Sequence, residues 1–269
     1  MISIFELEKR GDVMKEYYKL YDDMLEREDF YHYDESKFCS LKEFIDMNIE
    51  LSPFVDGVSS LDEFITDYNL NKMPQQTMAL YICDFILNFF SWAGDVKSPI
   101  YKDYKEFYDY SKKTFMVVLK QIYYILELAN YQNVEFEHPS YTFPTIRIVK
   151  RDHDVDSILS YLDEEPRIRV LSYLDFRVES NVQEKLNIIR SLYVDLEAIG
   201  SKLSNAERRA NPYSEVKMCL NFARHFREKN ISDTEAIEYL DYSFYKFIHY
   251  IRENYFKENS HILEAIKKG

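Results

Sequence analysis

Apolar side chains recur every three or four residues along most of this chain, which is the spacing of amphipathic helices. In the first half, helices are predicted at residues 1–30 and 40–50 and from Pro74 to about Ala93. The clearest stripe lies between residues 100 and 130 and predicts one helix with a single buried face. Its positions are Tyr101, Tyr104, Tyr108, Ser111, Phe115, Val118, Ile122, Ile125 and Ala129.

The period changes between residues 133 and 151. Apolar residues alternate with polar ones there, and Pro139 and Pro144 interrupt any helix. This pattern predicts a small β element, one irregular hairpin. The change of period also marks the boundary between two predicted domains, an acidic, tyrosine-rich helical domain at 1–132 and a second helical domain at 133–269.

Helical periodicity returns after the β element. Short helices are predicted at Asp154–Leu162 and Arg167–Leu174, and longer ones begin at capping signals. The fold class is therefore predicted to be mainly α, a multi-helix bundle with a small β element near residues 133–151. The capping signals are Ser180 with Gln183, Asn211 before Pro212, and Ser232 with Glu235.

Composition supports a folded, helical protein without a cofactor-binding loop. Apolar residues make up 46% of the 269 residues, which is enough to build a core, and there are only 5 glycines. Few glycines leave little room for phosphate-cradling loops, and no Walker, dinucleotide-binding or serine-hydrolase motif is present. The three cysteines are far apart in sequence, which indicates a reducing compartment and no zinc site. We expect no cofactor and no bound metal.

No segment of the sequence resembles a membrane span or a signal peptide. The most hydrophobic run, Ala79 to Ala93, is interrupted by Asp84 and Asn88 and is shorter than the roughly 20 residues that a bilayer requires. The first ten residues already carry charges, which is not typical of a signal peptide. We therefore predict a cytoplasmic protein that does not bind a membrane.

The net charge of −13 is distributed unevenly. Residues 1–70 hold 18 acidic and 7 basic side chains, whereas residues 201–230 hold 7 basic and 3 acidic ones. The two regions could pair within the molecule or across a dimer, and a phosphate-bearing partner would be attracted to the second region only. The alternative is that both regions are simply solvated helix faces.

A helix predicted over residues 212–228 carries the main candidate site. At about 100° per residue, Asn221 and His225 fall opposite its apolar stripe, one turn apart, and Arg224 lies on the flank beside Asn221. An imidazole that moves protons and a guanidinium that stabilises a pentavalent phosphate can together cleave RNA without a metal. The alternative is that Arg224 and His225 are ordinary surface or interface residues. The apolar stripe is Val216, Cys219, Leu220, Ala223 and Phe226.

Two further patterns are weaker. Arg147 precedes His153 by six residues, a spacing known from helical ribonuclease motifs, but both lie at the predicted β element and we interpret the spacing as coincidence. Acidic side chains around His153 could ligate magnesium or manganese, but acids are also favoured at a helix start by the helix dipole. The remaining histidines have no partner by spacing. The acids are Asp152, Asp154 and Asp156, and the remaining histidines are His32, His138, His249 and His261.

The run that begins KRDHDVDSILSYLDEEPRIRVLSYLDF at Lys150 and ends NFARH at His225 resembles the C-terminal half of bacterial proteins linked to abortive infection. In that group, small helices follow a short strand, then come a tyrosine-containing turn, a "KxxIL…LA…LEP" helix and a helix with an Asn-Ile-Arg-His-Asn-Asn motif. The corresponding pieces here are Ser172-Tyr173-Leu174, Lys185 to Glu197 and Arg224-His225.

This resemblance covers about residues 145–250 and implies an HEPN-like helical domain, a fold in which many members are ribonucleases or inactive relatives that act as dimers. The sequence departs from the motif at its amides. Phe222 stands in place of the Asn before the Arg-His pair, and Phe226 and Arg227 stand in place of the two Asn after it. If those amides serve the family's function, that function is altered here.

Two hypotheses follow from different classes of function. The first is a phage-defence protein of the abortive-infection type whose HEPN-like domain is a metal-independent ribonuclease, with Arg224 and His225 as catalytic residues and Asn221 in support. The second is a non-catalytic helical module that binds a protein partner or a second copy of itself through tyrosine-rich faces. The expected partners are RNA under the first hypothesis and a protein or a second copy under both.

Overall fold

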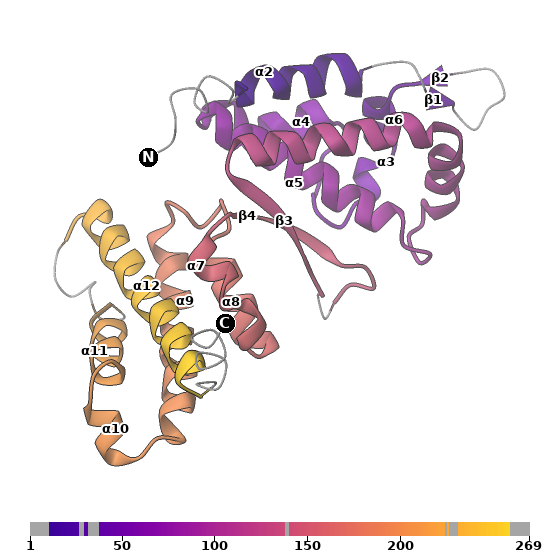
Figure 1. Ribbon diagram of the computed structural model, residues 1–269. Coiled ribbons are helices and arrows are strands. Elements are labelled where there is room, and N and C mark those ends of the chain that lie inside the picture. Colours follow the sequence, from indigo (N-terminus) through magenta and orange to yellow (C-terminus); the bar gives the residue numbers. More distant parts are fainter. Residues whose placement is uncertain are drawn as a thin grey trace. The chain divides into compact units, whose positions relative to one another are not determined.

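The computed structural model describes residues 11–26, 30–31, 38–137, 140–223, 225 and 231–258 (Figure 1). The chain divides into two compact units, Met1–Val149 and Lys150–Gly269. The predicted boundary lay before the β element, whereas this division lies after most of it. The described residues are mainly helical, and the predicted fold class is confirmed.

Unit 1 is a set of helices with two small pairs of strands. The first helix was predicted to span 1–30, but the helical residues end at Leu25, and Phe30–Tyr31 form a strand; residues 1–10 lie outside the described part. The elements are α2 (Val13–Tyr18), a π-helical segment (Lys19–Leu25), β1 (Phe30–Tyr31), β2 (Phe38–Cys39), α3 (Leu41–Asn48), α4 (Leu61–Asp67), α5 (Gln75–Ala93), α6 (Tyr101–Leu128), β3 (Tyr131–Phe136) and β4 (Thr145–Lys150), with 3-10 turns at Ile49–Leu51 and Leu70–Lys72.

Helix α5 is the centre of unit 1 and is buried on almost every side, which explains its nearly unbroken apolar sequence. Phe89 is fully buried and makes an edge contact with Phe44 at 6.4 Å. The predicted stripe of α6 is confirmed in its C-terminal half, where its positions from Phe115 to Ile125 are buried. In the N-terminal half, Phe107 is buried instead, because its ring stacks on Phe44 at 4.3 Å.

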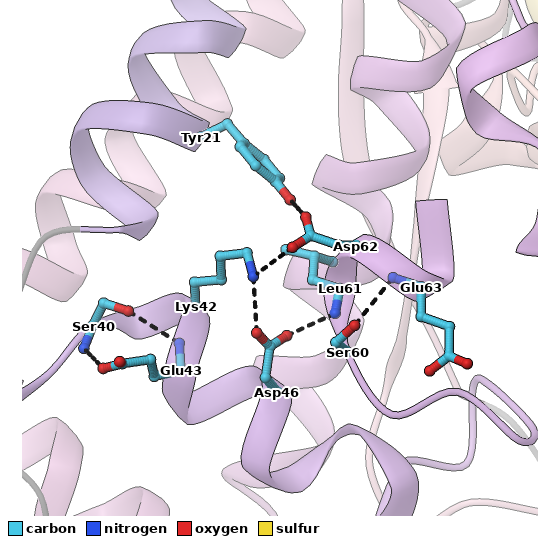
Figure 2. A network of polar contacts seen from close by, with 9 residues as sticks. All are labelled: Tyr21, Ser40, Lys42, Glu43, Asp46, Ser60, Leu61, Asp62 and Glu63. Carbon is cyan, nitrogen blue, oxygen red and sulfur yellow. Dashed lines mark hydrogen bonds and ion pairs between the residues drawn. The ribbon is translucent and has the colours of Figure 1, made fainter. Parts of the chain in front are cut away.

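A network of polar contacts fastens the first helices of unit 1 together (Figure 2). The ammonium of Lys42 lies 2.9 Å from a carboxylate oxygen of Asp46 and 2.9 Å from one of Asp62. Asp46 also accepts a hydrogen bond from the backbone N–H of Leu61, and Asp62 accepts one from the hydroxyl of Tyr21. Because α3, α4 and the π-helical segment each supply a partner, this network has a structural role.

The β3–β4 hairpin is attached to α5 by one buried amide. The side chain of Asn88 donates to the carbonyl of Ile146 and accepts from its N–H, both at 2.8 Å. The amide thus satisfies the backbone of β4 in the way that a neighbouring strand would. Of the two polar residues that interrupt the hydrophobic run of α5, Asn88 is therefore the one that positions the hairpin.

Unit 2 consists of helices with short connections. The cap of its long helix α9 is Asn181, one residue later than the predicted Ser180, because the Asn181 side chain accepts from the N–H of Glu184. The capping box of Ser232 and Glu235 is confirmed by reciprocal hydrogen bonds. The elements are α7 (His153–Asp156), a 3-10 turn (Leu159–Tyr161), α8 (Glu164–Tyr173), α9 (Val182–Ser201), α10 (Asn205–Arg209), α11 (Tyr213–Ala223) and α12 (Asp233–Glu258).

Helices α9, α11 and α12 pack against one another and enclose the core of unit 2 (Figure 1). Gly200 permits the close approach of α9 and α11, because a Cβ at this position would lie 1.9 Å from the hydroxyl of Tyr213. In α12, the apolar side chains of Leu240, Phe244 and Phe247 are fully buried. Among the described residues, no helix is both long enough and apolar enough to cross a bilayer.

Candidate functional site

Helix α11 carries the predicted site and is shorter than expected. Residues 212–228 were predicted to be helical, but among the described residues the helix ends at Ala223, and the N–H of His225 donates to the carbonyl of Phe222 in a tighter turn. The predicted apolar stripe from Val216 to Ala223 is buried. Phe226 and Arg224 lie outside the described residues.

Two of the three predicted site residues are described, and both are exposed. Asn221 lies in the last turn of α11, opposite its buried side, and His225 lies in the turn that follows. His225 is therefore not enclosed by the core. Because Arg224 is outside the described residues, the convergence of the three side chains stays a prediction.

A row of aromatic rings begins within the same turn and crosses to α12. The ring centroid of Phe222 lies 4.7 Å from that of Tyr239, which lies 6.3 Å from that of Tyr242. The ammonium of Lys246 lies 5.4 Å from the centroid of the Tyr242 ring. Tyr242 is 50% exposed, whereas the other two rings are partly covered. We call Phe222, Tyr239 and Tyr242 the aromatic row.

Charged side chains border the aromatic row. Lys246 is paired with Glu215 of α11 at 2.6 Å, and this carboxylate, followed by the Tyr242 hydroxyl, raises the pKa of the ammonium above its usual value. On the other side of α11, Lys217 is paired with Glu197 of α9 at 2.5 Å. These pairs are exposed enough for water or a ligand to reach them, so their net contribution to stability is small.

The opposite flank of α12 carries a buried polar cluster. Lys185 of α9 lies 2.5 Å from a carboxylate oxygen of Asp241, and the Tyr173 hydroxyl donates to the same oxygen at 2.7 Å. The Lys185 ammonium lies 4.6 Å from the Tyr173 ring centroid, and that ring stacks on Phe244 at 4.0 Å. Burial, with the nearby Asp241 charge, raises the pKa of Tyr173. This cluster joins α8, α9 and α12.

Two acids at the start of α7 attach this short helix to the C-terminal part of α12. Asp152 caps α7 and accepts from the Tyr245 hydroxyl at 2.5 Å. Asp154 is paired with Arg252 at 2.6 Å and lies 3.4 Å from His249, which the sequence had left without a partner. His249 and then Arg252 hold the pKa of Asp154 below its usual value.

Of the acids near His153, Asp152 therefore acts as a helix cap and Asp154 as an ion-pair partner. Within the described ranges, no group of three or more histidine, cysteine or acidic side chains is placed to hold a metal ion. Arg147, the other weak candidate of the sequence, places its guanidinium 4.7 Å from the centroid of the Phe136 ring. His32, His138 and His261 lie outside the described residues.

Three comparisons with known proteins were negative. No protein-family model, curated protein or solved structure matches this chain. The resemblance to abortive-infection proteins is therefore neither supported nor contradicted by these comparisons, and function must be argued from the residues themselves.

Sequence reasoning found the exposed end of α11 but missed the aromatic row beside it. Tyr239 and Tyr242 are three residues apart on α12 and lie outside its buried apolar stripe. Off-stripe aromatic residues at helical spacing were a signal that could have revealed the row. The contact between Phe222 and Tyr239 could not have been predicted, because it depends on how α11 packs against α12.

Proposed function

We propose that unit 2 is a metal-independent ribonuclease module, and that the protein acts in abortive-infection defence. The observation that supports the proposal most is the exposure of Asn221 and His225 at the end of α11, in the most basic stretch of the chain. The defence context rests on the resemblance of residues 145–250 alone. The first unit has no assigned role in the chemistry.

The proposed reaction is a transfer within the RNA strand. His225 takes the proton of a ribose 2′-hydroxyl, the 2′-oxygen attacks the adjacent phosphorus, and the bond to the 5′-oxygen breaks as that oxygen takes a proton from water, after which the imidazolium of His225 returns its proton to the resulting hydroxide. Arg224 stabilises the additional negative charge of the pentavalent phosphate, and Asn221 donates a hydrogen bond to the same group. The products are a 2′,3′-cyclic phosphate and a 5′-hydroxyl, and no metal is consumed or required.

The test is cleavage of single-stranded RNA by the purified full chain in the presence of a chelator. Replacement of a group that transfers protons lowers such rates by roughly 100-fold or more, so His225→Ala should lose activity to this extent. Arg224→Ala should behave in the same way. His249→Ala is the matched control, because this histidine also lies in unit 2 but is engaged with Asp154.

A cellular readout accompanies the assay. Induced expression of the wild type should arrest bacterial growth, and the two variants should not. The proposal fails if the wild type and both variants affect growth equally and the purified wild type leaves RNA intact.

A second candidate function, a non-catalytic interaction module, is favoured by one feature of unit 1. Helix α6 exposes four large apolar side chains within nine residues, and such residues usually mark a binding surface when they are contiguous. Light scattering should then give the mass of an oligomer, and Val117→Glu with Tyr124→Glu should give the mass of a monomer. A monomeric wild type would count against this candidate. The side chains are Met116, Val117, Tyr123 and Tyr124.

A further inference from the structure

The N-terminal half of α12 presents acids to the solvent. Residues 233–245 contain four acidic side chains and no lysine, arginine or histidine. Asp233 and Glu235 lie in the first turn, where the helix dipole favours acids. Glu238 lies beyond that turn and is exposed, and no described residue donates a hydrogen bond to its carboxylate or forms an ion pair with it. The fold therefore leaves the charge of Glu238 available to a partner.

The aromatic row lies beside these acids. Tyr239 and Tyr242 each follow an acidic residue by four positions, and residues at this spacing are neighbours on a helix surface. The two rings are inclined by 48° to each other, with 6.3 Å between their centroids, so they do not form a closed stack. Tyr242 is 50% exposed, so part of its ring surface is accessible. Because the face of an aromatic ring is electrically negative, this ring and the neighbouring carboxylate of Glu238 both attract a cation.

The chain itself shows how a cation binds such a ring. The ammonium of Lys185 lies 4.6 Å from the ring centroid of Tyr173. The ammonium of Lys246 lies 5.4 Å from the ring centroid of Tyr242. In both cases the lysine also forms an ion pair with a carboxylate. Lys246 follows Tyr242 by four residues, whereas Glu238 precedes it by four, so the ion pair of Lys246 leaves the carboxylate of Glu238 unused.

We propose that this surface docks a basic segment of a protein partner, with one arginine of the segment stacked on the ring of Tyr242 and paired with the carboxylate of Glu238. Arginine fits these two groups better than lysine, because its planar guanidinium stacks on a ring while its N–H groups reach a carboxylate. The acids around the row steer a basic segment toward it. The inference concerns binding alone and goes beyond the proposed function, because it requires no cleavage of RNA.

The test uses the full chain and a fluorescein-labelled peptide in which arginine and glycine alternate. Fluorescence anisotropy should show that Tyr242→Ala binds this peptide roughly 2- to 5-fold more weakly than the wild type, which is the loss expected from one exposed cation–π contact. Glu238→Gln should weaken binding by a similar factor, because it removes the charge and keeps the shape. Tyr242→Phe should bind like the wild type, because the contact uses the ring and not the hydroxyl. A peptide with lysine in place of arginine should bind the wild type more weakly.

Two variants in unit 1 are matched controls, and both should leave the affinity unchanged. Tyr123→Ala removes a ring that is 44% exposed but lies in residues 110–126 of α6, which contain three lysines and no acid. Glu106→Gln removes one exposed carboxylate from the same helix. All variants should unfold at the same urea concentration as the wild type, so that a loss of affinity is not a loss of folding.

Each other outcome overturns the inference. If Tyr242→Ala or Glu238→Gln binds the peptide as the wild type does, or the controls in unit 1 lose as much affinity, the row does not dock a basic segment. If single-stranded RNA binds with a stronger dependence on Tyr242 than the peptide does, the occupant is a nucleic acid. If the wild type is a dimer that Tyr242→Ala converts to a monomer, the occupant is a second copy. None of these outcomes changes the cleavage assay, so the two proposals can fail separately.

Discussion

The two flanks of α12 carry the same three kinds of residue in different surroundings. On one flank, Lys185 lies over the ring of Tyr173 and pairs with Asp241. On the other, Lys246 lies over the ring of Tyr242 and pairs with Glu215. Tyr173 is 3% exposed and the side chain of Lys185 is 5% exposed, whereas Tyr242 is 50% exposed and that of Lys246 is 32% exposed.

This difference in burial changes what each cluster can do. In the buried cluster, the ring of Tyr173 and the side chain of Lys185 are buried, although Asp241 is as exposed as Glu215, at 37% each. Removal of the carboxylate therefore leaves a buried ammonium without compensation, so the cluster fixes the packing of α8, α9 and α12. In the exposed cluster, water replaces a lost partner at little cost. The exposed cluster can therefore exchange its contacts for those of a ligand, and the buried one cannot.

The largest expected effect is the loss of the acid that faces the buried lysine. Asp241→Ala leaves the buried Lys185 ammonium and the Tyr173 hydroxyl without their shared acceptor, which should lower the free energy of unfolding by about 2–3 kcal/mol, because the carboxylate itself is 37% exposed. Glu215→Ala is the matched change on the other flank and should cost less than about 1 kcal/mol. Urea unfolding measures both values. Equal costs would show that the two clusters do not differ in the way burial implies.

A smaller effect is expected from one added methyl group between α9 and α11. Gly→Ala within a helix normally stabilises a protein, but Gly200→Ala should destabilise this one by about 1–3 kcal/mol, because the Cβ would overlap the buried ring of Tyr213. In a Tyr213→Ala background the same change should become neutral or stabilising. The double-mutant cycle in urea measures this reversal of sign, and its absence would show that the two residues are not in conflict.

A substitution in the exposed cluster should change the affinity of the protein for RNA more than its free energy of unfolding. Glu215→Gln removes the negative charge that faces Lys246 and should strengthen binding of single-stranded RNA by roughly 2- to 5-fold at low salt. The gain should fall as salt is added, because the interaction is screened. Fluorescence anisotropy across a salt series measures it. Weaker binding by Glu215→Gln would mean that the carboxylate itself contacts the ligand.

The smallest expected effect is a loss of stability at acidic pH. The pKa of Asp154 is lowered by His249 and Arg252 in the folded state. The ionised carboxylate therefore stabilises the fold at a pH above its pKa in the unfolded chain, about 3.9, and this stabilisation is lost as the pH falls through its pKa in the folded protein. Because the side chain is 40% exposed, Asp154→Asn should cost less than about 1 kcal/mol at neutral pH. Urea unfolding should show that this difference shrinks as the pH falls below about 4, and that it is smaller in an Arg252→Met background, where His249 alone faces the carboxylate.

Helix positions were predictable from the sequence where local chemistry and burial agreed. The Ser232–Glu235 box and the stripe of α6 between Phe115 and Ile125 depend on neighbours within a few residues, and both are confirmed. The cap of α9 was misplaced by one residue, because Ser180 and Asn181 are neighbouring residues that both make good caps. The role of Gly200 depends on a ring from another helix, which no local pattern contains.

The candidate site was predictable in part. The polar face of α11 follows from its period, and Asn221 is exposed as expected. The end of the helix at Ala223 was not predicted, because no glycine or proline marks it. The partners of His249 and Lys185 come from residues more than fifty positions away in the sequence, so no spacing rule could have revealed them.

The most direct measurement is photocrosslinking of 4-thiouridine RNA to the full chain, followed by identification of the modified peptides. If the end of α11 binds the RNA that it is proposed to cleave, the crosslinks should fall on the peptides of unit 2 that carry Asn221 and His225. Crosslinks confined to unit 1 would contradict the assignment of this part of unit 2 to RNA.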